Sequence, residues 1–414
     1  MGRSDLQVAI IGGGIAGLGL ALNLHERGIS CTVYESAPEI KELGVGITLL
    51  PHATRELTQL GLQESLRAVA IENEESRFFN RFGQQLYKEA RGKFAGYRYP
   101  EFGIHRGRLH LVMYKAALNR LGAGRILTNR QCTAVEQDGK SVTLRLRETS
   151  TGTGLPAESA DVAIACDGVN SAVRRQFYPG ERVAFAGINT WRGVTRWPPI
   201  LGGRTYMRIG SIRTGKLVVY PIIDDVDGKG NQLINWMAEI QQDTVAMNDW
   251  NKPGKLEDFF DIYRGWKFDW LDAAAMIRSA DMILEYPMVD KDPVGRWTFD
   301  RITLAGDAAH PMYPRGSNGA AQALIDVRTL ADQLASSPGS AAALKAYEAL
   351  RLEPTAKVVR TNRQYGPDFI NIRVEELVGD RPFENLDDVI TQEELRALSE
   401  NYKRIAGFTV ENLR

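Results

Sequence analysis

A glycine-rich turn near the N-terminus constrains the fold more than any other feature of this sequence. An apolar run, 8–11, leads into Gly12-Gly13-Gly14-Ile15-Ala16-Gly17, and a helical pattern follows over 15–27. In a strand-turn-helix unit of this kind, Gly12 permits the tight turn, Gly14 lets the main chain approach a pyrophosphate, and Gly17 allows close helix packing. Free amides and the positive dipole end at the start of the helix favour phosphate groups. The segment therefore predicts a Rossmann-type dinucleotide site.

A second strand supports this interpretation. The short apolar run 31–34 ends at Glu35, whose carboxylate is placed to accept hydrogen bonds from a ribose. An acidic residue here disfavours a nucleotide with a 2′-phosphate, because two negative charges would face each other. The expected nucleotide is FAD or NAD. A tight turn without a ligand stays open as an alternative.

Balanced charges narrow the choice of partners. The 414 residues carry 51 basic and 51 acidic side chains, which gives no electrostatic reason to expect nucleic acid or an anionic membrane. A small-molecule ligand is the default, and the length suits about two to three domains. Residues 1–5 leave no room for a signal peptide before the first strand, and no apolar run is long enough to cross a bilayer. We therefore expect a cytoplasmic protein.

Cysteine and histidine usage excludes further classes. Cys31, Cys132 and Cys166 lie far apart in strand-like runs, which predicts buried, reduced packing residues. Because no Cys-x-x-Cys pair is present, the chain does not fit the flavin disulfide reductases. The five histidines show no metal-ligand spacing, so no metal is expected.

The remaining sequence indicates two layers built from discontinuous segments. The apolar runs 161–166 and 301–305 are typical of buried parallel strands, whereas 183–287 holds short β-type runs and most of the tryptophans. We expect an α/β fold with a Rossmann-like cofactor-binding domain, a β-sheet substrate domain and C-terminal helices. The expected ranges are 1–72, 100–180 and 288–360 for the first domain, 73–99 and 181–287 for the second, and 361–414 for the C-terminal helical segment.

Three local elements are also expected. A helix is predicted over 53–66, and alternating strands over 133–136 and 142–146 should form a hairpin through Asp138-Gly139. A long helix is predicted from about Gly319 to Ala335.

Three motifs in a fixed order give the chain a family resemblance. They are Gly12-x-Gly14-x-x-Gly17, Asp167-Gly168 and Gly306-Asp307-Ala308-Ala309-His310-Pro311. With this order and spacing, the chain resembles the single-component FAD-dependent aromatic hydroxylases, the family of para-hydroxybenzoate hydroxylase, over nearly its full length. The segments 189–195, 286–293 and 312–320 resemble the subfamily of 5-methylphenazine-1-carboxylate monooxygenases of the pyocyanin pathway.

The resemblance implies a set of FAD contacts. Asp307 would accept hydrogen bonds from the ribityl chain, and Val45 and Gly46 would border the isoalloxazine ring. Asp167 would help to hold both FAD and the incoming nicotinamide cofactor. The expected cofactor contacts are Gly12, Gly14, Ala16, Gly17, Glu35, Val45, Gly46, Arg106, Asp167, Asp307, Pro314 and Gly319. A helix-capping role for Asp307 and a surface ion pair for Arg106 or Arg108 stay open.

The loop after His310 is expected to border the reacting part of the flavin. The resemblance implies that Pro314 lies near the ring where oxygen reacts, and that Gly316, Asn318 and Gly319 are the other catalytic positions. The helix that begins there would direct its positive end to the flavin N1–C2=O region and stabilise an anionic reduced flavin by about 1 kcal/mol. His310 is left out of catalysis, because a histidine beside proline is more often a structural hydrogen-bonding residue.

The resemblance further implies a reaction with NADH or NADPH and O2. The nicotinamide would visit only transiently, because no second dinucleotide fingerprint is present. A flavin C4a-hydroperoxide would then hydroxylate an aromatic or heteroaromatic carbon, and carbon dioxide would leave if that carbon carried a carboxylate. The protein would be a monomer or homodimer. An FAD oxidase or dehydrogenase that releases peroxide, and a non-enzymatic FAD-bound module, stay open as alternatives.

Four residues are candidates for the substrate pocket. Trp191, Tyr220 and Trp236 could line a flat aromatic pocket, and Arg192 could pair with a substrate carboxylate. Ordinary sheet core is the competing interpretation for each aromatic residue, and a solvent-facing position is the competing interpretation for the arginine.

Overall fold

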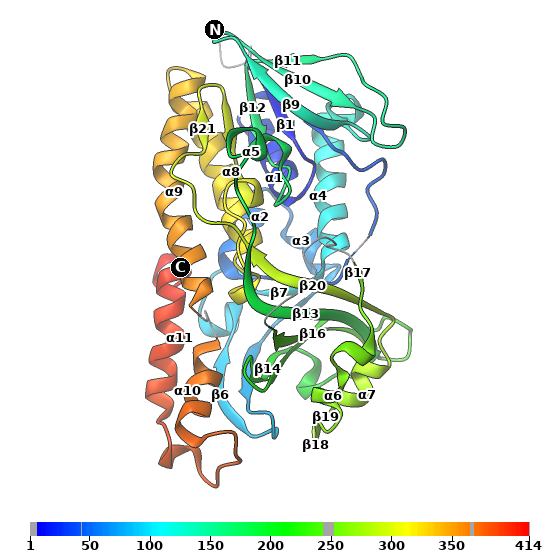
Figure 1. Cartoon of the computed structure of the whole chain (residues 1–414), viewed down its shortest axis with the longest axis vertical. Coiled ribbons are helices and arrows are strands. Elements are labelled where there is room, and N and C mark those ends of the chain that lie inside the picture. The colour runs from blue at the N-terminus through cyan, green and yellow to red at the C-terminus, as the bar shows by residue number, and fades with distance from the viewer. Residues whose placement is uncertain (1–5, 43, 243–251, 365–367, 414) are drawn as a thin grey trace.

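The chain folds into two stacked parts, seen in a computed structural model that describes residues 6–42, 44–242, 252–364 and 368–413 (Figure 1). The upper part in Figure 1 contains a mostly parallel sheet with helices packed on it, and the lower part contains a larger, mostly antiparallel sheet. Residues 1–5, to which the expectation about a signal peptide refers, lie outside the described residues.

The sheet of the upper part has six strands in the order β21-β22-β12-β1-β2-β8. All are parallel except the edge strand β21. Their bounds are Gln7–Ile11 for β1, Ser30–Tyr34 for β2, Ile126–Leu127 for β8, Val162–Ala165 for β12, Thr298–Phe299 for β21 and Ile302–Leu304 for β22. The central strands are buried on both faces, which explains their unbroken apolar runs. The strands predicted from these runs are confirmed.

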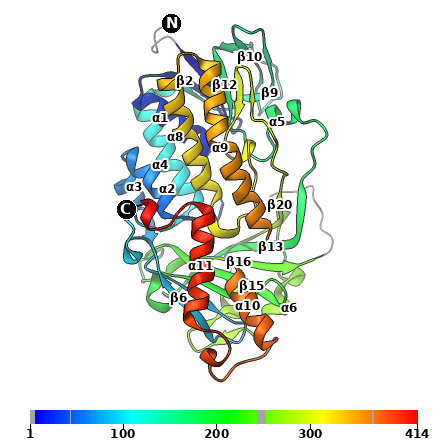
Figure 2. The ribbon, with the colours of Figure 1, turned by 90° about the vertical axis from the view of Figure 1, so that its left-hand side faces the viewer.

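Helices cover this sheet, as Figure 2 shows. They are α1 (Ile15–Glu26), α2 (Pro51–Gln59), α3 (Gln63–Arg67), α4 (Arg106–Leu121), α5 (Ala172–Phe177) and α8 (Gly319–Ser336), with α9 (Ser340–Arg363) packed on α8. Gly19 lets α1 lie close to α8, because a Cβ atom there would be 3.1 Å from Leu324. The predicted helix 15–27 ends one residue early, with Arg27 as its C-cap. The long helix predicted from Gly319 is confirmed as α8.

One predicted helix is wrong in its extent. The segment 53–66 forms two helices, α2 and α3, rather than one. Gly61 lies between them with a φ of +70°, a left-handed conformation that an α-helix does not contain.

Two small antiparallel sheets complete the upper part. The first contains β9 (Gln131–Gln137), β10 (Val142–Arg147) and β11 (Glu158–Ala160), and its hairpin through Asp138-Gly139 is confirmed. The second has the order β3-β7-β4 and comprises β3 (Gly46–Leu49), β7 (Phe102–His105) and β4 (Ala70–Glu72).

The lower part is built on an eight-stranded sheet in the order β17-β20-β13-β16-β15-β14-β5-β6. Its bounds are Glu75–Phe79 for β5, Gln85–Ala90 for β6, Ala184–Trp197 for β13, Thr205–Ser211 for β14, Gly215–Ile223 for β15, Gln232–Gln241 for β16, Lys252–Pro253 for β17 and Met282–Asp290 for β20. We call the face toward Val45 and β3 the inner face. The outer face packs on α6 (Phe260–Tyr263) and α7 (Ala273–Arg278), beside the small hairpin of β18 (Lys267–Phe268) and β19 (Leu271–Asp272).

The C-terminal helices link the two parts. Helix α9 runs down the side of the molecule, and α10 (Phe369–Val378) and α11 (Gln392–Ala406) lie against the edge of the eight-stranded sheet (Figures 1 and 2). Ile370 and Leu395 from these helices share a buried cluster with Phe78 of β5 and Tyr87 of β6. The C-terminal segment therefore packs on the eight-stranded sheet.

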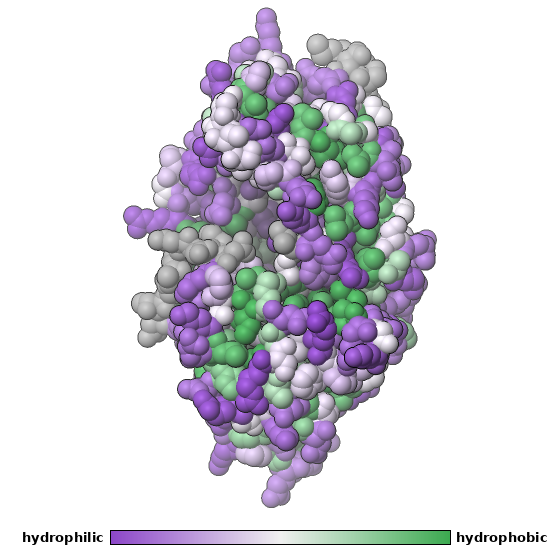
Figure 3. All heavy atoms as spheres, turned by 90° about the vertical axis from the view of Figure 1, so that its right-hand side faces the viewer, coloured by the Kyte–Doolittle hydropathy of each residue, from purple (hydrophilic) through white to green (hydrophobic). Residues whose placement is uncertain are grey.

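The surface carries mainly polar side chains. On the face drawn in Figure 3, apolar side chains form several separate groups rather than one continuous patch. Cys31, Cys132 and Cys166 are buried and free of disulfides, which confirms the prediction. Within the described ranges, no helix combines the length and the apolar character needed to cross a bilayer.

Candidate active site

The glycine turn between β1 and α1 leaves one space open beside its main chain. A Cβ atom on Gly12, where φ is +100°, would lie 2.5 Å from the carbonyl oxygen of Cys166. One on Gly17 would lie 1.9 Å from the carbonyl oxygen of Gly12, so protein atoms require glycine at both positions. By contrast, no protein atom lies within 4 Å of a Cβ on Gly14. A phosphate can approach the free amides of α1 there.

Glu35, directly after β2, lies against this turn. Its Oε2 accepts a 2.6 Å hydrogen bond from the Gly13 amide, and its Oε1 accepts one of 2.6 Å from the Ala37 amide. The side chain is only half-buried, so its remaining lone pairs can accept hydrogen bonds from ribose hydroxyls. His110 of α4 lies 2.6 Å from the Gly13 carbonyl oxygen through its Nε2. Nothing in the sequence near the turn indicates this histidine, which comes 97 residues later.

Asp167 follows β12 and begins the turn into α5. Its Oδ2 accepts a 2.8 Å hydrogen bond from the Ala172 amide, whereas its Oδ1 is buried and has no partner in the described part of the chain. Burial raises the pKa of this carboxyl, although hydrogen bonds from Ser171 and main-chain amides oppose the shift. Because an unpartnered buried carboxylate oxygen is costly, a ligand hydroxyl fits this position.

Arg174 of α5 connects the Asp167 turn to the second glycine-aspartate segment. Its fully buried guanidinium donates hydrogen bonds to the carbonyl oxygens of Ala308 and Ala309 and pairs with Glu181. The sequence did not single out this arginine. Its contacts fix the two turns relative to each other.

Asp307 lines an open cleft of about 630 Å³ between the two parts. Its Oδ1 is 4.0 Å from the place that a Cβ would take on Gly319, the first residue of α8. Surrounding protein raises the pKa of this carboxyl, and the charges of His310 and Arg106 partly offset the shift. The capping interpretation is wrong, because Asp307 lies within a short 3₁₀ turn and its side chain caps no helix.

Val45 and Gly46 lie at the contact between the two parts. The Gly46 amide donates a 2.7 Å hydrogen bond to Asn235 Oδ1, and the Gly46 carbonyl oxygen accepts one of 3.0 Å from Arg192 Nη2. Val45 is buried in a cluster with inner-face side chains such as Tyr220. The structure therefore brings Val45 and Gly46 together with two of the four predicted substrate residues.

Arg106 and Arg108 have different surroundings at the start of α4. Arg108 pairs with Glu42 at 2.8 Å, whereas Arg106 is exposed, close enough to Asp307 to influence its pKa, and makes no ion pair with any described residue. The surface-pair interpretation thus applies to Arg108.

Ala16 and Gly306 pack the two glycine segments together. A Cβ atom on Gly306, whose φ is +59°, would lie 3.0 Å from the Ala16 Cβ and 3.3 Å from the Ala323 Cβ. Because position 306 carries no side chain and positions 16 and 323 carry only a methyl group, α1 and α8 can approach each other beside the Gly306-Asp307 turn.

We call the loop 314–319 the flavin loop, after the position beside the flavin that the family resemblance implies for it. Its residues point to two sides. Pro314 lines the cleft with Asp307. Asn318 points inward and is 1% exposed, since its Nδ2 donates a 2.7 Å hydrogen bond to the Tyr402 hydroxyl and its Oδ1 lies 3.1 Å from His52 Nε2. Both partners hold the Asn318 side chain on the inward side of the loop. Any catalytic role of this position would therefore fall to its main-chain amide, and it stays a prediction.

Trp191 and Trp236 do not line the cleft. They are 1% and 0% exposed and lie in the core of the outer face, where Trp191 stacks on Phe259 at 5.0 Å and Trp236 donates a 3.0 Å hydrogen bond to Thr195. Strand side chains alternate between faces, so Arg192 points to the opposite side from Trp191. The expectation of substrate contact is wrong for both tryptophans, and the sheet-core interpretation holds.

Arg192 and Tyr220 do lie on the inner face. Arg192 lines the cleft with Asp307 and Pro314. Tyr220 stacks on Tyr206, with ring centroids 4.9 Å apart. Burial raises the pKa of the Tyr220 hydroxyl, against the opposing charge of Arg192.

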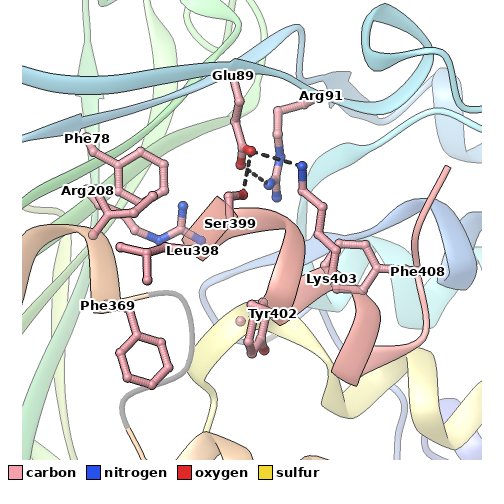
Figure 4. A pocket seen from close by; sticks show the side chains of 12 residues that line it. Phe78, Glu89, Arg91, Arg208, Phe369, Leu398, Ser399, Tyr402, Lys403 and Phe408 are labelled. Atoms are coloured by element: carbon pink, nitrogen blue, oxygen red, sulfur yellow. Dashed lines mark hydrogen bonds and ion pairs between the residues drawn. The ribbon is translucent and has the colours of Figure 1, made fainter. Parts of the chain in front are cut away.

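A second, narrow cavity lies between the eight-stranded sheet and α11 (Figure 4), and Gly316 of the flavin loop forms part of its lining. Arg208 of β14 lines it together with Phe78 and Tyr402. The guanidinium carbon of Arg208 lies 4.9 Å from the Phe78 ring and 4.6 Å from the Tyr206 ring. The sequence analysis missed Arg208, although strand alternation places it on the same face as Tyr206.

His310 is a structural residue. It pairs with Asp326 of α8, which also pairs with Arg351 of α9 at 2.7 Å and accepts a 3.1 Å hydrogen bond from the Gly306 amide. Burial opposes ionisation of Asp326, but the charges of His310 and Arg351 hold its pKa below the usual value. This buried trio anchors the Gly306-Asp307 turn to two helices.

His52 makes stability depend on pH. Burial lowers the pKa of this imidazole from its ordinary 6.5 to about 3, so between these values the unfolded chain binds a proton that the folded chain does not. Stability therefore falls as the pH drops, by about 2 kcal/mol between pH 7 and pH 5. Urea unfolding at both pH values should show a smaller loss for His52→Gln than for the wild type. His25→Gln, at an exposed position on α1, is the matched control, and equal losses in His52→Gln and the wild type would contradict the prediction.

The carboxyl ends of β1, β2, β12 and β22 meet at one edge of the parallel sheet. At this edge the glycine turn, whose free amides can bind a phosphate, lies beside acidic side chains that can accept hydrogen bonds from hydroxyl groups. FAD carries both kinds of group, and the unpartnered Asp167 Oδ1 and the open side of Gly14 give it a place to bind. The fold and this site define an FAD-dependent monooxygenase of the aromatic-hydroxylase class. The chain belongs to the family described as FAD binding domain, which matches residues 5–197 and 285–362.

Individual relatives agree with this class. The chain is 38% identical to a phenazine 1,6-dicarboxylic acid hydroxylase of Lysobacter antibioticus, with 87% of this chain and 90% of the relative covered. It is 30% identical to a 3-hydroxybenzoate 6-hydroxylase of Polaromonas naphthalenivorans, with 91% of each covered. A crystal structure of Klebsiella pneumoniae HpxO with FAD and uric acid shares the fold, with a TM-score of 0.76, 19% identity and coverage of 99% and 97%.

Proposed function

We propose that this monooxygenase hydroxylates a planar aromatic or heteroaromatic carboxylic acid and that Arg208 binds the carboxylate. One observation carries the proposal. Arg208 is 5% exposed, donates a 3.1 Å hydrogen bond to Ser76 Oγ, and makes no ion pair in the part of the chain that the structure describes. The nearby carboxylate of Asp368, whose pKa the charge of Arg208 helps to lower, pairs directly with Lys216. A buried cation needs a compensating anion. A substrate carboxylate in the cavity beside Gly316 would supply it, and Phe78 would offer an apolar ring face there (Figure 4). Tyr206 lies on the same face of the sheet, with its ring 4.6 Å from the Arg208 guanidinium carbon.

The relatives' names support an acidic ring as the substrate. Phenazine 1,6-dicarboxylic acid and 3-hydroxybenzoate both carry a carboxylate on a planar ring. The relative at 38% identity, together with the subfamily resemblance of 189–195, 286–293 and 312–320, makes a phenazine carboxylate our first choice. The enzyme could hydroxylate a free ring carbon, or it could attack the carbon that carries the carboxylate and release carbon dioxide. The mass of the product distinguishes these two reactions.

The proposed roles of the chain in catalysis are binding, orientation and exclusion of water. FAD, when bound, supplies oxidation of NADH or NADPH and activation of O2. Asp307 would accept hydrogen bonds from the ribityl hydroxyls, Glu35 would accept them from the ribose, and the amides beside Gly14 would hold a phosphate. The amino end of α8 at Gly319 would present its positive dipole to the bound flavin, and Pro314 with the inner face of the sheet would exclude water. The other cofactor contacts expected from the sequence remain part of this proposal.

Arg192 is a second candidate for the substrate carboxylate. It lies in the cleft with Asp307, and its Nε is buried without a partner among the described residues. Burial favours Arg208 instead, because Arg208 is 5% exposed whereas Arg192 is only partly buried. We propose that Arg192 and Tyr220 shape the space between the flavin and the substrate.

Replacing Asp307 by alanine should weaken FAD binding about 10- to 100-fold, because hydrogen bonds to a charged group contribute about 1.5–3 kcal/mol each. Fluorescence titration of the apoprotein with FAD measures the effect. Asp269→Ala, at an exposed position between β18 and β19, is the matched control. FAD affinity within twofold of the wild type in Asp307→Ala would remove Asp307 from the site.

The reaction is tested by NADH and NADPH oxidation with phenazine, quinoline and hydroxybenzoate carboxylates, scoring peroxide and product mass together. We expect one class of acid to stimulate oxidation and give a product sixteen mass units heavier, or one with hydroxyl in place of carboxyl. Stimulated oxidation that yields only peroxide would favour the oxidase alternative. FAD binding without any nicotinamide oxidation would favour the non-enzymatic module.

Three broader expectations are also part of the proposal. The FAD-binding and substrate parts divide as 1–72, 100–180 and 288–360 against 73–99 and 181–287, which is supported by the strands of the two main sheets falling in these ranges apart from the end of β20. The segment 361–414 forms the third part. We further propose that the protein works in the cytoplasm as a monomer or homodimer.

A further inference from the structure

The Tyr402 hydroxyl lies at the centre of the inward side of the flavin loop. It accepts a 2.7 Å hydrogen bond from Asn318 Nδ2 and lies 3.2 Å from Asn362 Oδ1 of α9, to which it donates. The Arg315 carbonyl oxygen is 3.5 Å away. The side chain is 6% exposed. One phenol from α11 thus contacts both ends of the loop and a third segment.

Gly316 makes room for this phenol. A Cβ atom on Gly316 would lie 1.7 Å from the Tyr402 hydroxyl oxygen and 2.5 Å from the adjoining ring carbon. The residue also has a φ of +71°, which glycine adopts without strain. The loop conformation and the position of Tyr402 therefore depend on each other.

A second contact from the same segment reaches the loop indirectly. Phe408 stacks on His52 with ring centroids 4.9 Å apart and an interplanar angle of 9°. His52 in turn lies 3.1 Å from Asn318 Oδ1 through its Nε2. The amide of Asn318 is thus held on both sides by groups that the segment 392–413 supplies or packs against.

We propose that the segment 392–413 is a clamp that fixes the flavin loop in its working conformation, with Tyr402 as the positioning residue. The proposal rests on the placement of this loop beside the flavin under the proposed function. Tyr402 touches no reacting atom in this scheme. It determines where Pro314 and the amino end of α8 stand relative to the ring, and so how well the activated oxygen is kept from water.

Tyr402→Phe tests the clamp, because it keeps the ring and removes the hydroxyl. We expect a changed visible spectrum of bound FAD and a rise of about fivefold in the peroxide formed per product, as the loss of about 1 kcal/mol of positioning energy allows. Tyr263→Phe is the matched control. Tyr263 is also a fully buried tyrosine, and its hydroxyl donates a 2.9 Å hydrogen bond to the Lys216 carbonyl oxygen of β15, on the outer face of the sheet and outside the segment 392–413.

The two variants separate positioning from stability. Both should lower the unfolding temperature by similar amounts, and only Tyr402→Phe should alter the flavin spectrum and the peroxide fraction. An unaltered spectrum in Tyr402→Phe, or the same alteration in Tyr263→Phe, would overturn the proposal. The spectrum of bound FAD is readable even if no substrate in the panel is hydroxylated, so failure of the proposed function would be recognised separately.

A double-variant comparison checks the contact itself. If Tyr402 acts through Asn318, then Asn318→Ala combined with Tyr402→Phe should change the flavin spectrum no more than the larger single effect. Fully additive changes would show that the two side chains act independently, and the clamp would then lose its central link.

Discussion

Asp326→Asn is expected to lower the free energy of unfolding by about 3–5 kcal/mol. Asp326 is fully buried and is the shared partner of His310 and Arg351. Asparagine has nearly the same shape but no charge, so Arg351 would remain as a buried cation without its anion. Breaking a buried pair from one side carries a penalty of this size, since the remaining charge cannot be solvated. Urea unfolding at pH 7 measures this loss.

The same variant should also bind FAD more weakly, because the Gly306 amide donates a hydrogen bond to this carboxylate.

The same helix offers the control. Asp332 of α8 pairs with Arg27 and Arg328, but its side chain is 42% exposed. Exposed pairs contribute about 0–1 kcal/mol, so Asp332→Asn should be nearly neutral. Equal destabilisation by the two variants would show that burial of the Asp326 trio adds nothing to the stability of the chain.

Arg208→Met is expected to lower kcat/KM for a carboxylate substrate by about 30-fold to a few thousand-fold, while FAD affinity stays unchanged. Losing one partner of a buried charge pair costs about 2–5 kcal/mol, and here the unpaired group would be the carboxylate of the substrate. Methionine fills much of the same volume and can pack against Phe78 and Tyr206, so the fold should tolerate it. Steady-state kinetics with the substrate found in the panel measure the loss.

Two comparisons make this prediction specific. An analogue that lacks the carboxylate should be turned over equally by Arg208→Met and the wild type. Arg204→Met, just before β14 with its side chain 43% exposed, is the matched surface control. If Arg192→Met caused the loss and Arg208→Met did not, the carboxylate would lie in the cleft beside Asp307 rather than in the cavity beside Gly316.

Local features made the upper part predictable from sequence. The turn at Gly12 and Gly17 leaves no room for a side chain, and β1, β12 and β22 are unbroken apolar runs because both of their faces are buried. Such constraints act between neighbours in the chain, so they are visible in the sequence. The break at Gly61 is the exception, because a helical pattern on both sides concealed it.

The roles of residues in the eight-stranded sheet were harder to predict. An alternating strand pattern separates the residues into two faces but does not show which face lies toward the cofactor-binding part. Trp191 and Arg192 were both plausible, and only the packing of α6 and α7 puts Trp191 in the core. Arg208 was missed for a related reason. An arginine on a strand is ordinary until Ser76 and the aromatic rings around it are known, and those come from other parts of the chain.

The contacts around Asn318 could not be predicted at all. Its amide meets Tyr402, 84 residues later, and His52, 266 residues earlier. The sequence pattern identified the loop as important but gave no sign that the asparagine points inward. Contacts at such separation depend on the path of α9 and α11 along the side of both parts.

The placement of Tyr402 has a consequence for biosynthesis. The parallel sheet lacks β22 until Ile302 has been translated, and the flavin loop lacks its inward partner until Tyr402 has left the ribosome. Domains generally fold as their N-terminal portions emerge, so the turn at Gly12 can form early. The loop 314–319 acquires its inward hydrogen bond only after α11 has been synthesised.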